Sequence, residues 1–395
     1  MASITKRERP ALEKDGTPKI QTKGKNKGEP IVVEVWRARY RSGGKEHARH
    51  FGRKVDAQNW LDVETGAKVD GTWSDPSKAR VQFASVAETW ATNPSWAAST
   101  RARNEGILSR HVLPRWGSVK LAEVTHEDAQ AWTNSLVKSG LAAGSVRKIV
   151  GVFSGVLASA VKSKRLRVNP TDGIELPRQR LAPRRYLTAG QVEAVAEASD
   201  EWGDLVLVLA YTGLRIGEAS ALRVGHVNTL RRRLTIEESV TEVNGRLVWS
   251  APKDHQRRSV PYPTFMDADI AERMTGKGPS DLLFTTDAGT PVRVRNMRRD
   301  WFDLAAHVAG VEGLTPHELR HTAASLAVSA GANVLALQRM LGHEKPSTTL
   351  DVYSDLFDED LDAVADALTS ARARALADSV RTESPIVLRA SGVTA

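Results

Sequence analysis

Hydrophobic and polar residues alternate along Val35–Arg41, and this period of two predicts a β-strand with one buried face. Side chains at alternate positions of a strand point to the same face, so Trp36, Ala38 and Tyr40 would lie together against a core. The opposite face would carry three arginines, Arg37, Arg39 and Arg41. The pattern therefore predicts a sheet with one apolar face and one cationic face.

The residues around this strand predict a small N-terminal domain over 31–75. Gly43-Gly44 indicates a turn, and Lys45–Phe51 is expected to return as a second strand. Asp56–Glu64 has the spacing of a short helix that packs back on the sheet. Residues 1–30 show no periodicity, so we expect a flexible basic arm there.

Apolar residues then recur at spacings of three and four, which predicts helices in an all-helical domain over 80–170. The expected helices are Phe83–Trp90, Ser99–Val112, Thr125–Val137 and Ser145–Ser163. Ser99, Thr125 and Ser145 are predicted to cap their N-termini. Residues 171–186 contain prolines and arginines, Arg178 and Arg180 among them, and predict a basic linker.

From Leu187 the pattern changes to α+β, which predicts a second large domain over 187–370 and a tail over 371–395. Thr188–Ser199 and Leu205–Tyr211 read as helices. The strands expected after them are Leu234–Val240, Arg246–Ser250 and Val260–Tyr262. Asn244-Gly245 is a strong hairpin signal between the first two. Helices are expected to dominate from Arg295 to Ala377.

Charge changes this picture because the basic residues are concentrated. The chain of 395 residues has a net charge of +9, and residues 1–60 hold 15 Lys and Arg against 7 Asp and Glu. Residues 162–185 hold 8 basic residues against 2 acidic ones. Basic segments in separate domains favour a polyanion that runs past all of them, and an arginine-faced sheet is one way to contact DNA. A solvated surface would carry the same charges, so both interpretations stay open here.

Composition also excludes several classes of protein. The chain has no cysteine, which excludes disulfides and thiolate metal sites and fits a cytoplasmic setting. No apolar run reaches the roughly 18 residues of a membrane span, so we expect no membrane association. The basic N-terminus has no apolar segment behind it and is not a signal peptide.

The chemistry-bearing residues gather toward the far end of the chain. Thr315-Pro316-His317-Glu318 is a helix start with a capping box, which places His317 and Arg320 on one face near the positive helix end. Gly331 and Asn333 are expected to end this helix and begin the next. That next helix would end at Gly342 and leave His343 at its edge.

Tyr353 follows on a last helix that Ser347 can cap, and Arg215 lies far upstream in Thr212-Gly-Leu-Arg-Ile-Gly-Glu218. Two guanidiniums can hold a phosphate, imidazoles can move protons, and a phenol can attack phosphorus. A zinc site formed by three histidines, His317 and His321 among them, is the alternative. The pair lacks the glutamate arrangement of a metalloprotease, and the arginines would repel a cation.

These motifs, in this order, resemble the tyrosine recombinase (phage integrase) family. The match consists of Arg215 in T-G-L-R-I-G-E, H-E-L-R-H at 317–321, L-G-H at 341–343, and Tyr353. The resemblance implies a multidomain fold, mainly α with an α+β catalytic domain. A small N-terminal β-sheet domain for arm-type DNA sites and a helical, SAM-like core-binding domain would precede it. This plan is similar to the two-site integrases.

Residue by residue, the resemblance implies that Arg215 and Arg320 grip the scissile phosphate, with His317 assisting proton transfer and His343 bonding the phosphate. Tyr353 would be the nucleophile. The family also uses a lysine in a hairpin turn, which Lys253 matches in position. Glu218 is expected to orient local structure, and His321 to be structural and to point elsewhere on its helix.

The function implied is site-specific DNA recombination without cofactor or metal, through a 3′-phosphotyrosyl intermediate and a Holliday junction. The expected partners are double-stranded attachment sites, three further copies of the chain in a tetramer on DNA, a host DNA-bending protein and an excisionase. The setting would be the cytoplasm of a bacterial host. A conjugative-transposon integrase, a dimer-resolving recombinase, a type IB topoisomerase-like enzyme and a catalytically silent DNA-binding regulator are the alternatives. Residues beyond about 370 are expected to pack on a neighbouring subunit.

Overall fold

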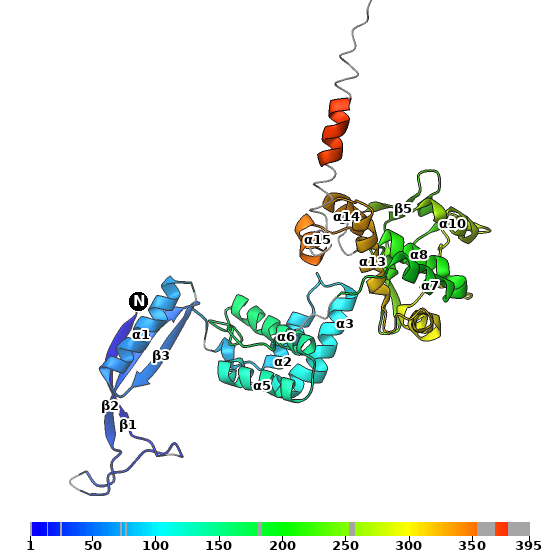
Figure 1. The fold of residues 1–395 in the computed structure, drawn as a ribbon. Helices are drawn as coiled ribbons and strands as arrows, with labels where there is room; N and C mark the ends of the chain where they lie inside the picture. The colour runs from blue at the N-terminus through cyan, green and yellow to red at the C-terminus, as the bar shows by residue number, and fades with distance from the viewer. Residues whose placement is uncertain are drawn as a thin grey trace, which may run out of the picture. The chain divides into compact units, whose positions relative to one another are not determined.

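The computed structural model describes residues 2–13, 15–23, 26–71, 73–75, 77–179, 184–252, 257–353 and 368–377. The chain forms two compact units, Met1–Arg180 and Leu181–Ala395 (Figure 1). The division falls inside the segment 171–186 that the sequence predicts as a linker. Lys253, Arg180 and most of the predicted tail 371–395 lie outside the described residues.

The N-terminal part of the first unit is a three-stranded antiparallel sheet with one helix on it. Its strands are β1 (Ser3–Pro10), β2 (Val32–Ser42) and β3 (Lys45–Phe51), in the order β1-β2-β3. Helix α1 (Lys54–Val69) packs against β2. The hairpin and the helix confirm the sequence prediction, although α1 is longer than expected.

Strand β1 corrects the expectation that residues 1–30 form a flexible arm. Ser3 pairs with Arg39, and the register runs without a break to Pro10 opposite Val32. Most of the β1 side chains are exposed, so the strand has no apolar pattern to detect. The strand is held by its backbone hydrogen bonds to β2. Without β1, the N–H and C=O groups on that edge of β2 would have no strand partner.

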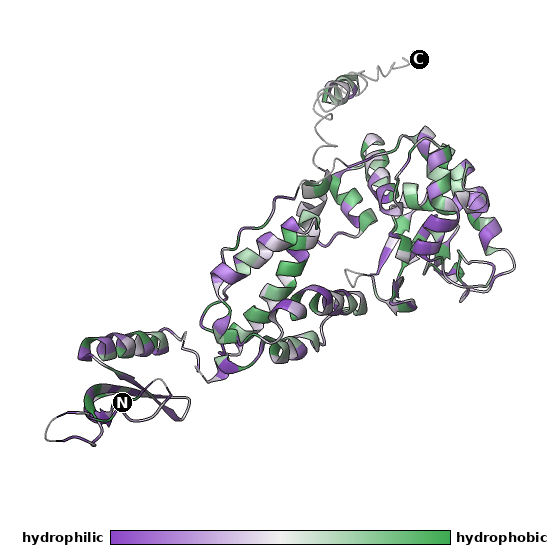
Figure 2. Ribbon diagram, turned by 90° about the horizontal axis from the view of Figure 1, so that it is seen from below, coloured by the Kyte–Doolittle hydropathy of each residue, from purple (hydrophilic) through white to green (hydrophobic). Residues whose placement is uncertain are grey.

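The second part of the first unit is a bundle of helices: α2 (Phe83–Ala91), α3 (Ala98–Ile107), α4 (Leu113–Trp116), α5 (His126–Lys138) and α6 (Ala143–Lys162). A π-helical turn at Leu108–Val112 joins α3 to α4. Phe153 stacks on Trp116 at 4.8 Å between ring centroids, in the centre of an apolar core. Figure 2 shows green apolar and purple polar residues interleaved along these helices, as a one-sided core requires.

Two of the three predicted caps in the bundle are wrong. Thr125 accepts a hydrogen bond from the Asp128 amide at 3.1 Å and caps α5 as expected. The helices α3 and α6 instead begin at Ala98 and Ala143, upstream of Ser99 and Ser145. Neither helix has a side-chain cap, so its start leaves no polar signal in the sequence.

Helix α6 is long and apolar enough to cross a membrane by length and composition, and it is the single such helix among the described residues. Eight of its side chains, from Val146 to Ala160, are buried in the bundle core. Its apolar face is therefore accounted for by the core of the bundle.

The second unit begins with α7 (Ala189–Glu197), α8 (Gly203–Thr212) and the short α9 (Ile216–Ala219). Strands β4 (Val227–Asn228), β5 (Arg233–Ile236) and β8 (Arg258–Pro261) form one sheet, in the order β4-β5-β8. Strands β6 (Ser239–Val243) and β7 (Arg246–Ser250) form a separate hairpin. The predicted strand 234–240 is thus two strands that belong to different sheets.

The Asn244-Gly245 turn confirms the predicted hairpin, with φ of 51° and 79° at its two residues. Helices follow: α10 (Asp267–Met274), α11 (Val294–Met297), α12 (Asp303–Val308), α13 (Pro316–Ser329), α14 (Val334–Leu341) and α15 (Pro346–Tyr353). Helices α13, α14 and α15 lie side by side (Figure 1). The last of them starts at Pro346, so the predicted cap at Ser347 lies inside the helix.

Candidate active site

Arg215 is fixed by the helix that follows it. It is the N-cap residue of α9, and its backbone N–H donates to Glu218 Oε2 at 2.9 Å. Its guanidinium Nη1 donates to Glu218 Oε1, also at 2.9 Å. The Arg215 side chain remains 26% exposed, whereas that of Glu218 is 1% exposed. One end of this ion pair is therefore anchored in the protein and the other faces outward.

A second arginine, Arg258 on β8, shares the same carboxylate. Its Nη1 and Nη2 donate to the two oxygens of Glu218 at 3.0 Å and 2.5 Å. Burial alone would raise the pKa of Glu218, but the hydrogen bonds and charges of Arg258 and Arg215 outweigh it and hold the pKa below its usual value. Glu218 therefore orients both arginines, in agreement with the prediction that it orients local structure. The sequence did not indicate Arg258 as a residue of the site.

Arg320 on α13 is held by main-chain carbonyl groups. Its Nη1 donates to the Gly213 carbonyl at 2.5 Å, and its Nη2 to the Leu341 carbonyl at 2.7 Å. Burial, followed by the charge of Arg215, lowers the pKa of Arg320 to about 10. The group is still cationic at neutral pH, and its charge interacts with that of Arg215.

Gly217 allows α9 to lie directly against β6. A Cβ atom there would come within 2.6 Å of the Val240 carbonyl oxygen, a rigid backbone group. We therefore expect Gly217→Ala to lower the free energy of unfolding by about 2 kcal/mol, because α9 must move away from the hairpin. Chemical denaturation followed by circular dichroism measures this.

Gly190 is a matched control because it occupies the same second position of α7 and a Cβ atom there meets nothing within 4 Å. Gly190→Ala should raise the free energy of unfolding by about 0.5 kcal/mol through the reduced entropy of the unfolded chain. An equal effect of the two substitutions would contradict the assigned contact.

The histidines of α13 lie on one side of the helix. His317 is exposed near the N-terminus of the helix. Thr315 caps this end, and the Thr315 backbone N–H donates to Glu318 Oε2 at 2.7 Å. His321 stands edge-to-face against His317, with ring centroids 4.9 Å apart. The expectation that His321 points away from the site is wrong: its Nδ1 lies 2.8 Å from the Tyr353 hydroxyl oxygen.

Tyr353 ends α15 and is packed into an apolar cluster. The side chain is 1% exposed and contacts the cluster formed by Ala324, Val328, Leu337 and Leu341 from α13 and α14. Burial raises the pKa of Tyr353, and the charge of Arg320 acts in the opposite direction. The phenol is thus protonated at neutral pH and lies among the cationic and imidazole groups of the predicted site.

His343 is stacked with Tyr353, with ring planes inclined by 9° and centroids 6.3 Å apart. It follows Gly342, which ends α14 in the left-handed conformation with φ of 68°, as the sequence predicts. Its Nδ1 is 2.9 Å from Thr349 Oγ1 on α15. A hollow of about 320 Å³ opens here, and the cationic and imidazole side chains among its lining residues are Arg257, Arg258, Arg339 and His343.

The structure therefore brings five of the predicted residues into one region of the second unit, through contacts among α8, α9, α13, α14 and α15. Lys253 lies outside the described residues and is not placed.

In the first unit, Arg37 and Arg39 lie on β2, and both pair with Glu46 of β3, at 2.8 Å and 3.4 Å. Arg41 is exposed on the same strand, and Arg178 is described in the linker segment.

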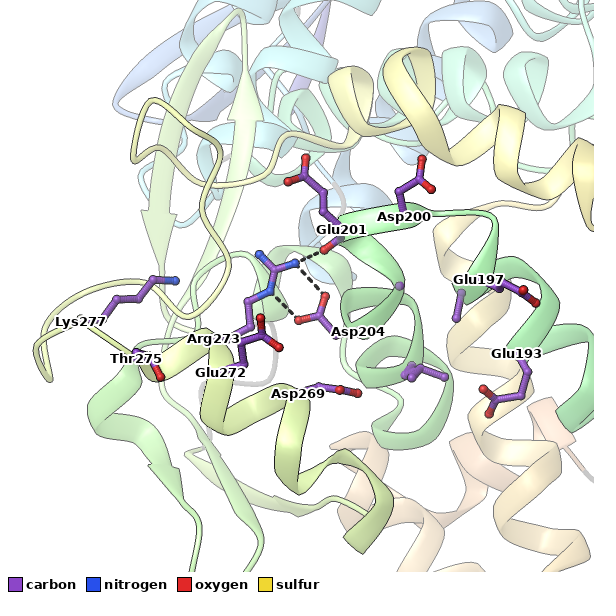
Figure 3. A pocket seen from close by; sticks show the side chains of 13 residues that line it. Glu193, Glu197, Asp200, Glu201, Asp204, Asp269, Glu272, Arg273, Thr275 and Lys277 are labelled. Atoms are coloured by element: carbon purple, nitrogen blue, oxygen red, sulfur yellow. Dashed lines mark hydrogen bonds and ion pairs between the residues drawn. The ribbon is translucent and has the colours of Figure 1, made fainter.

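A larger hollow of about 750 Å³ lies elsewhere in the second unit, between α7, α8 and α10, and has an acidic lining (Figure 3). Arg273 crosses it and donates to Asp204 Oδ2 at 2.5 Å. Glu193, Glu197, Asp269 and Glu272 are among its other carboxylates. It shares no lining residue with the predicted site, and its charge would repel a phosphate backbone.

Comparison with known proteins identifies two domains in the chain. The model of the phage integrase family matches residues 185–360, and the model of the phage integrase N-terminal SAM-like domain matches residues 82–137. The integrase of Mycobacterium phage D29 is 27% identical, over 75% of this chain and 83% of its own length. The integrase of Mycobacterium phage L5 is 26% identical, over 81% of this chain and 89% of its own length.

Solved structures show the same fold. The Tn1549 transposon integrase, in complex with a circular intermediate DNA, superimposes with a TM-score of 0.61 at 20% identity, over 69% of this chain and 95% of that one. A lambda integrase tetramer bound to a Holliday junction gives a TM-score of 0.51 at 17% identity, over 78% of this chain and 94% of that one. The two matched domains and the site motifs within them lead to one conclusion: this chain belongs to the tyrosine recombinase (phage integrase) family.

Proposed function

We propose that this protein is an integrase that cuts and rejoins DNA at specific sites through Tyr353. The observation that carries the proposal is the setting of Tyr353: its hydroxyl bonds His321, its ring is stacked with that of His343, and the charge of Arg320 acts on it. A catalytically silent DNA-binding regulator would need no phenol in this setting.

In the proposed reaction, the Tyr353 oxygen attacks the scissile phosphorus, the new O–P bond forms, and the bond to the 5′-oxygen breaks. The phenol loses its proton and the leaving 5′-oxygen gains one, with Lys253 as the proposed donor. His317 would assist proton transfer, and His343 would hydrogen-bond the phosphate. The ester energy is retained in the phosphotyrosine, so the reverse attack by another 5′-hydroxyl reseals the strand without ATP.

The two arginines would hold the non-bridging oxygens of the phosphate. Charge-assisted hydrogen bonds of this kind stabilise by roughly 1.5–3 kcal/mol each. They contribute more where the transition state gains negative charge, because their positions are fixed before reaction. Glu218 fixes Arg215, and two backbone carbonyls fix Arg320, so neither guanidinium needs to be ordered by the DNA.

Four copies of the chain would bring two attachment sites together, exchange one pair of strands, and form a Holliday junction before the second exchange. We propose that the helical bundle and the second unit bind the core site, with Arg178 and Arg180 of the linker contacting the DNA backbone. A host DNA-bending protein and an excisionase would control direction. The setting we propose is the cytoplasm of a bacterial host.

The sheet of the first unit is proposed to bind separate arm sites through Arg37, Arg39 and Arg41. Glu46 neutralises part of this face, so the charge available to DNA is smaller than the sequence alone indicates. Deletion of residues 1–65 should abolish recombination of DNA that carries arm sites while cleavage of the core site survives. Loss of core-site cleavage as well would contradict this division of labour.

The direct test of the proposed function is a covalent protein–DNA complex. DNA selected for binding from a random-sequence pool is nicked at successive positions, so that a cleaved strand diffuses away and religation is prevented. A denaturing gel should then show a slow band, and mass spectrometry should place the nucleotide on the peptide that contains Tyr353. No band on DNA that the protein demonstrably binds would favour the silent regulator.

A further inference from the structure

His321 contacts the reacting atom of the proposed nucleophile. It follows Arg320 on α13, and its Nδ1 lies 2.8 Å from the hydroxyl oxygen of Tyr353 at the end of α15. The two rings are 5.6 Å apart between centroids and inclined by 63°. This hydrogen bond ties the last residue of α15 directly to the helix that carries Arg320.

The position in which His321 holds Tyr353 is closed to DNA. The Tyr353 side chain is 1% exposed, and Ala324, Val328, Leu337 and Leu341 pack around it. In a reactive arrangement the attacking oxygen must approach phosphorus to about 3–3.5 Å. A phosphodiester cannot reach an oxygen that is covered in this way, so the hydroxyl must leave this position before it attacks.

Other contacts hold the same helix at neighbouring groups. Thr349 of α15 bonds His343, and the Arg184 guanidinium donates to the Val352 carbonyl. Neither contact involves the phenolic oxygen. His321 therefore holds the reacting atom, and the other two hold the helix that carries it.

The protonation of His321 suits a holding role. Burial lowers the pKa of His321 to about 4, and the nearby charges of His317, Arg184 and Arg320 act in the same direction. At neutral pH the imidazole is uncharged, so it can share a proton with the phenol and would add no cationic attraction for a phosphate.

We propose that His321 is a positioning residue that keeps Tyr353 in a buried resting position, and that attack on DNA begins when the His321–Tyr353 hydrogen bond breaks. The inference rests on the proposed function of Tyr353 as the nucleophile. His321 then controls the release of the phenol and does not itself bind the phosphate.

Three substitutions separate the hydrogen bond from the bulk of the ring. His321→Leu removes the bond and keeps much of the volume, and His321→Gln moves the polar group away from the Nδ1 position. His321→Asn is the matched control, because its amide occupies nearly the position of Nδ1 and can restore the bond.

The first measurement is nitration of free protein by tetranitromethane, with each of the five tyrosines followed by peptide mass spectrometry. Tyr353 should react several-fold faster in His321→Leu and His321→Gln than in the wild type or in His321→Asn. Tyr40 and Tyr262 are buried and should stay slow in every variant, which reports an intact fold. If Tyr40 and Tyr262 react quickly in His321→Leu, that variant is misfolded, and the nitration rate of Tyr353 in His321→Gln tests the proposal.

The second measurement is the rate of covalent complex formation at saturating nicked DNA. Removing a hydrogen bond that holds the resting state should raise this rate by roughly three- to tenfold. His321→Asn should match the wild type, and DNA affinity should be unchanged in all variants. A rate that is unchanged or lower in His321→Leu, with normal wild-type cleavage, would overturn the holding role. Absence of a covalent complex from the wild type would instead overturn the proposed function of Tyr353.

Discussion

Tyr353→Phe is expected to abolish the covalent protein–DNA complex while leaving the fold and DNA affinity unchanged. Phenylalanine keeps the ring that packs against Leu337 and Leu341, so the apolar cluster retains its volume. The substitution removes the hydroxyl and its hydrogen bond to His321, at a cost of about 1 kcal/mol in the free energy of unfolding. The denaturing gel on nicked DNA measures the loss, and a gel-shift titration measures affinity.

Tyr186→Phe is the matched control for this prediction. Tyr186 packs against the same apolar cluster and is the same residue type, but it carries no proposed role in attack. The Tyr186→Phe protein should form the covalent complex at close to the wild-type rate. A covalent band that persists in Tyr353→Phe would assign the nucleophile to another residue.

Glu218→Ala is expected to lower the free energy of unfolding of the second unit by about 3 kcal/mol. The carboxylate is 1% exposed and binds both Arg215 and Arg258, whose side chains are 26% and 10% exposed. Removing it takes away the buried carboxylate that two partly buried guanidiniums share. Arg215 also loses its orientation, so covalent complex formation should fall at least tenfold. Denaturant titration and the denaturing gel measure the two effects.

The pH dependence of this effect has a defined sign. The pKa of Glu218 is lower in the folded protein than its ordinary value of 4.5, so the carboxylate stabilises the fold above that pH. The stability difference between wild type and Glu218→Ala should be full at pH 7 and should shrink as the pH falls below 4.5.

Glu237→Ala is the comparison for Glu218. Glu237 pairs with Arg257 at 2.7 Å, but the Arg257 side chain is 72% exposed. Exposed ion pairs contribute less than about 1 kcal/mol, so this substitution should change the free energy of unfolding little. Equal losses from the two substitutions would show that burial of Glu218 is not the cause.

The sequence predicts the site through residues whose spacing along a helix is regular. His317 and Arg320 lie near the start of α13 because Thr315 and Pro316 define where that helix begins. Gly342 ends α14 and places His343 beside Tyr353 for the same local reason. The start and end of a helix depend on residues within a few positions of each other, so a single sequence is enough to predict them.

Long-range features escape the same reasoning. Arg258 is forty positions from Glu218, and nothing near it indicates that β8 will bring it to that carboxylate. The contact of His321 with Tyr353 depends on how α15 packs across α13, which helical spacing does not determine. Strand β1 escapes prediction because most of its side chains are exposed, so no apolar pattern accompanies its backbone pairing with β2.

The anchoring of Arg320 has an evolutionary consequence. Its two partners are the carbonyl oxygens of Gly213 and Leu341, groups that every amino acid possesses. Substitution of side chains at those positions cannot delete the acceptors and can only shift the chain that carries them. Drift among homologues could therefore replace most residues around Arg320 while the guanidinium kept its place, as long as the ends of α8 and α14 stayed where they are.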